Sequence, residues 1–147
     1  MSSSTPPLTT LPRSLARCRG LLELRISHHH FETLPKCVLE LRNLRRLEID
    51  CNVLLKALPE DIGVRLQSLT FLNMKACVRI TRLPSSLLER LEAAVVGKWH
   101  RRIPLLLTAG CFESGYLKNT IVPEMYPSLS MYLENGALTG TYVNLDS

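Results

Sequence analysis

One short line of sequence recurs four times between residues 11 and 87. Each copy has a leucine, a proline, two variable residues and a second aliphatic residue, and successive copies begin 23, 24 and 25 residues apart. A period of this length predicts a row of similar units, because one such unit is too small to bury its own apolar side. The copies are Leu11-Pro12-Arg13-Ser14-Leu15, Leu34-Pro35-Lys36-Cys37-Val38, Leu58-Pro59-Glu60-Asp61-Ile62 and Leu83-Pro84-Ser85-Ser86-Leu87.

A second pattern, LxxLxLxx(N/C)xL, lies between these copies. Its clearest example is Leu44, Leu47, Ile49, Asn52, Leu54; the others are Leu21, Leu24, Ile26, His29, Phe31 and Leu69, Leu72, Met74, Cys77, with Ile80 one place late. The alternation predicts a short strand over residues 46–50 whose Leu47 and Ile49 point inward. In the turn that follows, Asn52 can satisfy buried backbone groups, with His29 and Cys77 as its substitutes in the neighbouring units.

Together the two patterns resemble the leucine-rich-repeat family over residues 8–99, and the LPxx(L/I) flank resembles its intracellular plant type. They are similar to the repeat regions of plant nucleotide-binding disease-resistance proteins and to Ras-pathway scaffold repeats. The resemblance implies an α/β leucine-rich-repeat solenoid, a short right-handed arc with a parallel sheet on its concave side, followed by an irregular C-terminal tail. It also implies a non-enzymatic protein–protein interaction module of intracellular signalling or defence.

The charge of the chain changes near residue 104. Residues 1–104 carry a net charge of +8 and residues 105–147 carry −3, which suggests a boundary between them. We expect a disordered N-terminus over residues 1–7, the repeat domain over 8–103, and a tail over 104–147. The tail is expected either to cap the repeats or to be partly disordered, with a hairpin near 130–143 around Asn135-Gly136.

The last unit before that boundary is degenerate. Leu91, Ala94 and Val96 keep the spacing of a strand, and Trp99 stands where the turn residue is expected. We therefore expect a shrunken fourth coil that ends the repeats.

Side chains that alternate with the inward leucines should form one face of the sheet and bind another protein there. Adjacent units place Glu23 beside Arg46, Arg25 beside Glu48 and Asp50 beside Lys75, so that opposite charges face each other. An aromatic side chain exposed among these charges is a candidate anchor for a partner. The alternative is that the pairs only keep a solvated face neutral and in register. The expected partner-binding residues are Glu23, Arg25, Ser27, Arg46, Glu48, Asp50, Phe71, Asn73 and Lys75.

Nothing in the sequence indicates catalysis, a cofactor, a metal or a small-molecule substrate. Glycine-rich phosphate loops, HExxH and GxSxG are absent from the sequence, and so is the phosphate-binding loop of the resistance-protein nucleotide domain. A catalytic cysteine would need a partner histidine, which no spacing provides. The run His28-His29-His30 is not expected to hold a metal, because consecutive residues point in different directions and no second ligand cluster has suitable spacing nearby.

Other features bear on compartment and on alternative partners. Neither a secretory signal nor an apolar run long enough to span a membrane is evident, so a cytoplasmic location is expected, with the nucleus as the alternative. The net charge is +5, and the surplus arginines, among them Arg82 and Arg90, are expected on the flanks and the convex side. A specific nucleic-acid site is not expected, because stacking aromatics are not interleaved with the arginines. The alternatives are a basic surface that binds nucleic acid or anionic lipid nonspecifically, and a fragment of a larger disease-resistance-like receptor.

Overall fold

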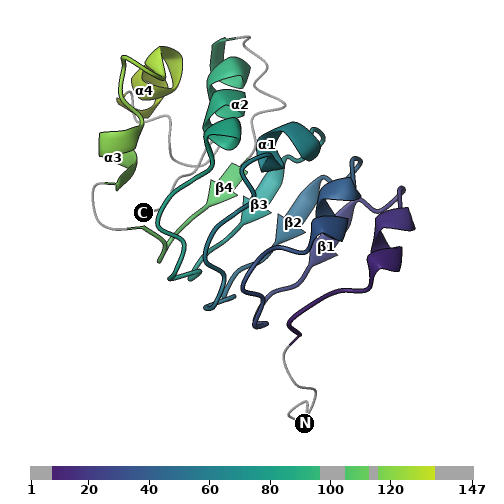
Figure 1. Ribbon diagram of the computed structural model, residues 1–147. Coiled ribbons are helices and arrows are strands. Elements are labelled where there is room, and N and C mark those ends of the chain that lie inside the picture. Colours follow the sequence, from purple (N-terminus) through teal and green to yellow (C-terminus); the bar gives the residue numbers. More distant parts are fainter. Residues whose placement is uncertain (1–7, 97–104, 113–115, 135–147) are drawn as a thin grey trace.

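A four-stranded parallel sheet forms the centre of the protein (Figure 1). The computed structural model describes residues 8–96, 105–112 and 116–134. The strands lie in chain order: β1 (Glu23–Arg25), β2 (Arg46–Glu48), β3 (Phe71–Asn73) and β4 (Leu105–Leu107). Each strand therefore belongs to one coil of the chain and pairs with the equivalent strand of the next coil.

The register of the first three strands is the one that the repeat predicts. Leu24, Leu47 and Leu72 share one row, and Glu23 and Arg46 pair in the row before it. Leu47 and Leu72 are fully buried, and Leu24 is partly buried against the core. The inward and outward phases of these strands are thus confirmed.

A row of short helices returns each coil along one face of the sheet (Figure 1). Two are 3₁₀ helices, η1 (Arg13–Arg17) and η2 (Lys36–Glu40), and two are α-helices, α1 (Ile62–Arg65) and α2 (Ser85–Val96). They contact one another in the order η1, η2, α1, α2. A proline precedes each 3₁₀ helix. Proline interrupts strand pairing, and its fixed φ suits the start of a helix, so the return segment begins there. Within the described residues, no helix is both long enough and apolar enough to cross a membrane.

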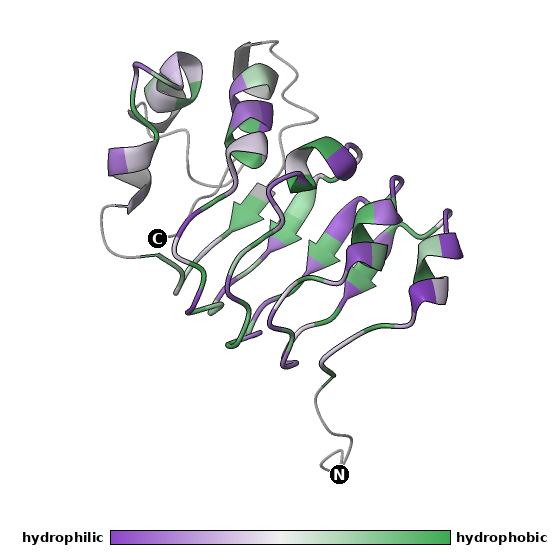
Figure 2. Ribbon diagram, viewed as in Figure 1, coloured by the Kyte–Doolittle hydropathy of each residue, from purple (hydrophilic) through white to green (hydrophobic). Residues whose placement is uncertain are grey.

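The core lies between this helical row and the sheet. Val38, Leu41 and Leu44 reach it from the second return segment and are fully buried, as are Ile62 and Leu66 in the third. Figure 2 shows hydrophobic residues recurring at similar places in successive coils. No coil could bury these side chains alone, so the stack is what provides a continuous core.

The turns that follow the strands share one backbone feature. Five residues after the start of each strand lies a residue with positive φ: His28 (61°), Cys51 (61°), Ala76 (59°) and Gly110 (85°). Glycine adopts this left-handed conformation freely, whereas other residues lose roughly 1–2 kcal/mol. The first three coils therefore accept strain at the turn, and the fourth relieves it with glycine.

The next residue of each turn joins neighbouring coils. Asn52 Nδ2 donates to the carbonyl oxygens of Ile26 (2.9 Å) and Ile49 (2.8 Å). Cys77 Sγ donates to the Ile49 oxygen at 3.2 Å, and Cys111 Sγ donates to a strand-end carbonyl of the third coil at 2.9 Å. The structure therefore gives Asn52 and Cys77 the backbone-satisfying role that the sequence predicts.

His29 does not take this role. Its Nδ1 accepts a hydrogen bond from the backbone N–H of Leu8 at 3.0 Å. In the part of the chain that the structure describes, no strand precedes β1 to supply a carbonyl acceptor. His29 instead ties the N-terminal segment to the first turn.

The fourth coil differs from the sequence prediction. Leu91, Ala94 and Val96 belong to α2 rather than to a strand. The segment is rich in leucine, glutamate and alanine, which favour a helix, and its buried Leu87 and Leu91 are about one helical turn apart. The fourth strand comes from residues 105–107, so the repeats extend past the expected boundary at residue 103. Trp99 lies outside the described residues.

The tail also differs from the prediction. It contains α3 (Tyr116–Thr120) and α4 (Pro127–Glu134), so a helix stands where the first strand of the hairpin near 130–143 was expected. The carboxylate of Glu92 accepts hydrogen bonds from the backbone N–H groups of Ser128 (3.0 Å) and Leu129 (2.7 Å). This contact from α2 satisfies amides at the start of α4, which local patterning cannot reveal. Residues 135–143 and 1–7 lie outside the described part of the chain.

Candidate protein-binding face

The face of the sheet turned away from the helices carries the residues expected to bind a partner. We call it the open face and define it by nine residues: Glu23, Arg25, Ser27, Arg46, Glu48, Asp50, Phe71, Asn73 and Lys75. The observed register pairs Glu23 with Arg46 and Arg25 with Glu48. Members of the first coil are mostly exposed, and those of the second and third coils are mostly half-buried. The structure therefore gathers these side chains on one continuous surface.

An arginine stacked on an aromatic ring lies in the row of the open face where the strands begin. The guanidinium carbon of Arg46 lies 3.9 Å from the centre of the Phe71 ring, a distance typical of a cation–π contact. Arg46 Nε also lies 3.4 Å from Glu48 Oε2 on the same strand. Phe71 is half-buried in this arrangement, so the aromatic that was expected to be exposed is partly covered.

The charge pairs expected between adjacent coils do not form. Among the residues that the structure describes, the ion pairs include neither Glu23 with Arg46, nor Arg25 with Glu48, nor Asp50 with Lys75. The predicted register is correct, but Arg46 reaches its own strand and the ring of the next coil instead. Side-chain direction, which the register alone does not determine, decides the pairing.

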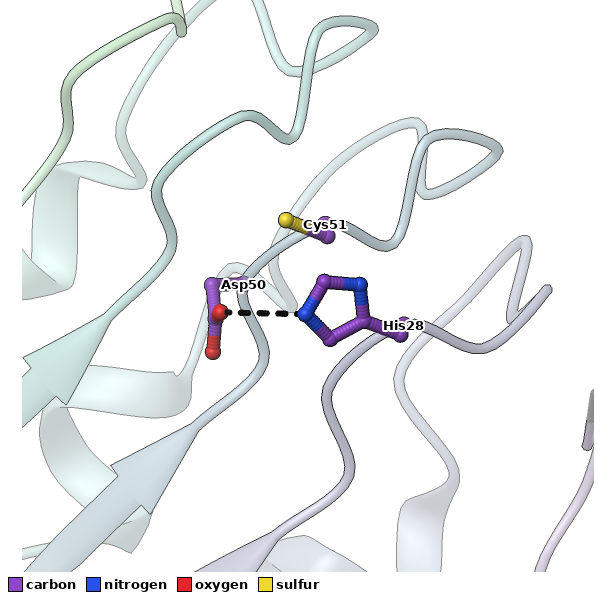
Figure 3. A group of neighbouring side chains, drawn as sticks. All are labelled: His28, Asp50 and Cys51. Carbon is purple, nitrogen blue, oxygen red and sulfur yellow. Dashed lines mark ion pairs between the residues drawn. The ribbon is translucent and has the colours of Figure 1, made fainter. Parts of the chain in front are cut away.

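Asp50 turns toward the preceding coil rather than toward Lys75. Its Oδ1 accepts a hydrogen bond from the hydroxyl of Ser27, and its Oδ2 lies 3.9 Å from His28 Nε2. The thiol of Cys51 lies in the same group (Figure 3). We call His28, Asp50 and Cys51 the turn-edge cluster. The sequence prediction missed it because its members come from two different coils.

The buried thiols are poorly suited to nucleophilic catalysis. Burial raises the pKa of Cys77 to about 12 and also raises the pKa of Cys111. Both thiols donate hydrogen bonds to backbone carbonyls, which requires the protonated form. Because the thiolate is the reactive species, these two cysteines are held in the unreactive form at neutral pH.

Two of the surplus arginines are engaged within the fold. Arg90 donates to the carbonyl oxygens of Leu66 (2.5 Å), Gln67 (2.8 Å) and Leu69 (2.8 Å), and burial lowers its pKa. On the helical side, Arg82 pairs with an acidic side chain of the preceding coil at 2.9 Å. Part of the surplus positive charge expected from the sequence therefore belongs to arginines that already have partners within the same chain.

Cys111 is a structural residue that sequence reasoning missed. Leu106, Thr108 and Cys111 have the same spacing as the inward and turn residues of the second coil. This copy of the strand-and-turn pattern is hard to recognise in the sequence. Its inward position 108 is a polar threonine, and the long α2 segment separates it from the preceding copy. The Gly110-Cys111 dipeptide, which repeats the turn positions, is the signal that could have revealed it.

Comparisons with known proteins support the architecture. No family model and no curated protein matches the chain. Among solved structures, it is similar to a leucine-rich-repeat protein of Leptospira interrogans, with a TM-score of 0.63 and 25% sequence identity. The match covers 83% of this chain but only 28% of that one. The chain therefore has an α/β fold of the leucine-rich-repeat type, and it spans less than a third of the length of that similar protein.

Proposed function

We propose that this protein is a non-enzymatic interaction module that binds another protein through the open face. The observation that carries the proposal is the Arg46–Phe71 stack on that face, with 3.9 Å between the guanidinium carbon and the ring centre. Arginine and aromatic residues are enriched where binding energy concentrates in protein interfaces. The resemblance to leucine-rich repeats favours the same side, and we place the open face on the concave side of a short right-handed arc.

The stack is held in place before a partner arrives. Glu48 contacts the Arg46 guanidinium at one edge, and the ring of Phe71 supports its flat surface. A side chain that is already ordered loses less conformational entropy on binding than a mobile one. This favours a partner that places an apolar or aromatic group on the stack.

Charged side chains of both signs lie on the same face as this stack. Glu23, Arg25 and Lys75 are exposed, and they can steer and orient a partner without dominating the affinity. A mixed rim of this kind fits a protein partner better than a polyanion, which would require an excess of cations on the same surface. We therefore favour protein over nucleic acid or anionic lipid.

The cellular setting is also a proposal. The LPxx(L/I) flanks support an intracellular, plant-type subtype of the repeat, and with it a cytoplasmic role in signalling or defence. The similarity to a longer repeat protein supports a segment of a larger receptor as the alternative setting. In either case the same face would be the binding surface.

Affinity capture from cells that produce the chain tests the proposal. The bait is the full chain, and the test variant is Arg46→Ala combined with Phe71→Ala, which removes the stack and leaves the inward leucines intact. We expect at least one captured protein to be lost with the double variant, and its binding to the purified chain to weaken by at least about tenfold.

The matched control is Arg82→Ala, which removes an exposed arginine on the helical side. It should capture the same protein as the wild type. Equal loss with both variants, or capture that disappears after nuclease treatment or at raised salt, would remove protein binding through the open face from consideration.

A further inference from the structure

Three potential metal ligands of different chemistry meet where two turns stack (Figure 3). His28 comes from the first turn, and Asp50 and Cys51 come from the second. Their imidazole nitrogen, carboxylate oxygen and thiol sulfur all lie within 4.8 Å of one another, and His28 Nε2 lies 3.9 Å from Asp50 Oδ2. The group is thus close to converging on one point.

We propose that the turn-edge cluster is a binding site for a divalent transition-metal ion, with Zn²⁺ as the preferred ion. Zinc accepts nitrogen, oxygen and sulfur ligands with bonds of about 2.0–2.3 Å in tetrahedral geometry. Such bonds place ligand atoms about 3.3–3.8 Å apart, so the cluster needs to contract by about 1 Å. The softness of the thiolate and the imidazole disfavours Ca²⁺ and Mg²⁺, which prefer oxygen ligands.

The proposal revises one expectation from the sequence, which gave the run His28-His29-His30 no metal. The run itself does not supply a ligand set, because His29 turns to the backbone of Leu8. His28 alone takes part, and the other two ligands come from the next coil. Their convergence depends on the stacking of two coils, which the spacing along the chain does not show.

The carboxylate is already oriented for this role. The hydroxyl of Ser27 donates to Asp50 Oδ1, which leaves Oδ2 facing His28 Nε2. Carboxylates that bind metals are usually held by such a hydrogen bond from a neighbouring residue. The Asp50 side chain is only 16% exposed, so the protein fixes one ligand firmly.

The backbone holds the other two ligands at the same edge. The N–H of His28 donates to the Asp50 carbonyl oxygen at 3.0 Å, and the N–H of Cys51 donates to the Lys75 carbonyl oxygen at 2.8 Å. These bonds continue the ladder of the sheet into the turns. The first bond joins the two coils that carry the ligands, and the second fixes the Cys51 turn against the third coil.

The ligands are confined to the first two coils. His28 and Cys51 occupy the turn position with positive φ, where the third coil has Ala76 and the fourth has Gly110. Alanine and glycine offer no ligand atom. Along the described turns, the chemistry for a metal therefore occurs at one place, and we expect one ion per chain.

An ion can reach the cluster from solvent. The His28 side chain is 69% exposed and can rotate by the small amount that the geometry requires. On binding, the thiol of Cys51 releases its proton to solvent and the thiolate bonds to the metal. Water completes the fourth position, which three protein ligands leave open.

Metal titration of the full chain tests the proposal. Chain stripped with a chelator is titrated with Zn²⁺ by calorimetry under reducing conditions, and with Co²⁺ by absorption spectroscopy. We expect one ion per chain and a thiolate-to-cobalt charge-transfer band, which shows that sulfur is a ligand. Absence of a binding heat together with absence of the band would refute the site.

Cys51→Gly provides the sharpest variant, because glycine removes the ligand and also suits the left-handed backbone. It should stay folded, lose the charge-transfer band and bind Zn²⁺ at least about tenfold more weakly. Asp50→Asn should weaken binding in the same direction.

Two control variants show whether the effect is local. Cys18→Ser removes an exposed thiol elsewhere, and His30→Ala removes a neighbouring imidazole outside the cluster. Both should bind Zn²⁺ as the wild type does. Unchanged affinity in Cys51→Gly, or loss of the band in Cys18→Ser instead, would overturn the assignment.

Discussion

Replacing Gly63 by alanine should force α1 away from α2. An ideal Cβ at this position would lie 2.6 Å from the carbonyl carbon of Ser86 and 2.8 Å from the backbone nitrogen of Leu87. Ordinary contacts begin near 3.4 Å, so the two helices would have to separate by a large part of an ångström. The obstructing atoms belong to backbone, which cannot rotate aside as a flexible side chain can.

The expected loss of stability is set by opposing contributions. Overpacking a closely fitted interior costs about 1–3 kcal/mol, and the hydrogen bond from Gly63 N–H to Ser86 Oγ, 3.1 Å long, would weaken by about 1 kcal/mol. Alanine gains up to about 1 kcal/mol over glycine in a helix. We therefore expect a net loss of about 2 kcal/mol in the free energy of unfolding. For a chain of this size that loss lowers the Tm by roughly 4–8 °C.

Chemical denaturation followed by circular dichroism measures this change. Gly20→Ala is the matched control, because its Cβ would meet nothing within 4 Å, and it should change stability by less than about 0.5 kcal/mol. Ser86→Ala removes the hydrogen bond without the clash and should cost about 1 kcal/mol. If Gly63→Ala is as stable as the wild type, the close approach of the helices does not constrain the fold.

Leu47→Ala should cost about 2–5 kcal/mol by denaturation, whereas Glu48→Ala should cost less than about 1 kcal/mol; equal effects would show that the strand phase is wrong. Asn52→Leu removes a donor to two buried carbonyls and should cost at least about 1–3 kcal/mol; a wild-type midpoint would contradict this role. Glu92→Gln should increase amide exchange in α4, because its carboxylate holds the first turn; unchanged exchange would count against the cap. Burial raises the pKa of folded Cys77 from 9.0 to about 12, so the stability it contributes is complete below pH 9.0 and is lost as pH rises toward 12. Cys77→Ala should reduce that pH dependence, and an unchanged pH profile would show that another group causes it.

The repeat period made much of the fold predictable. A side chain at each strand position is buried or exposed according to its parity, so Leu47 and Ile49 could be placed from local sequence alone. The turn residue Asn52 could be placed as well, because its amide is suited to satisfying the carbonyls that the turn exposes. The open face follows from the same alternation, because Arg46 and Glu48 must point away from the core when Leu47 points into it.

Other features depended on how the coils stack. Residues 91–96 fit the spacing of a strand, but they belong to the longer helix α2, which packs against α1 and α4. Residues 105–107 supply the strand instead. The stacking of the coils also decided which side chains meet. Arg46, for example, contacts Phe71 and Glu48 rather than Glu23.

The sequence by itself determined the period and the buried leucines, and it predicted the strand register because the same pattern recurs in successive coils. Tertiary structure alone decided which segment completes the sheet and which side chains meet across coils. His28 and Asp50 are far apart along the chain, and only the parallel ladder brings the imidazole within 3.9 Å of the carboxylate. Contacts of this kind depend on the direction that each side chain takes in the packed coils, which the register alone does not determine.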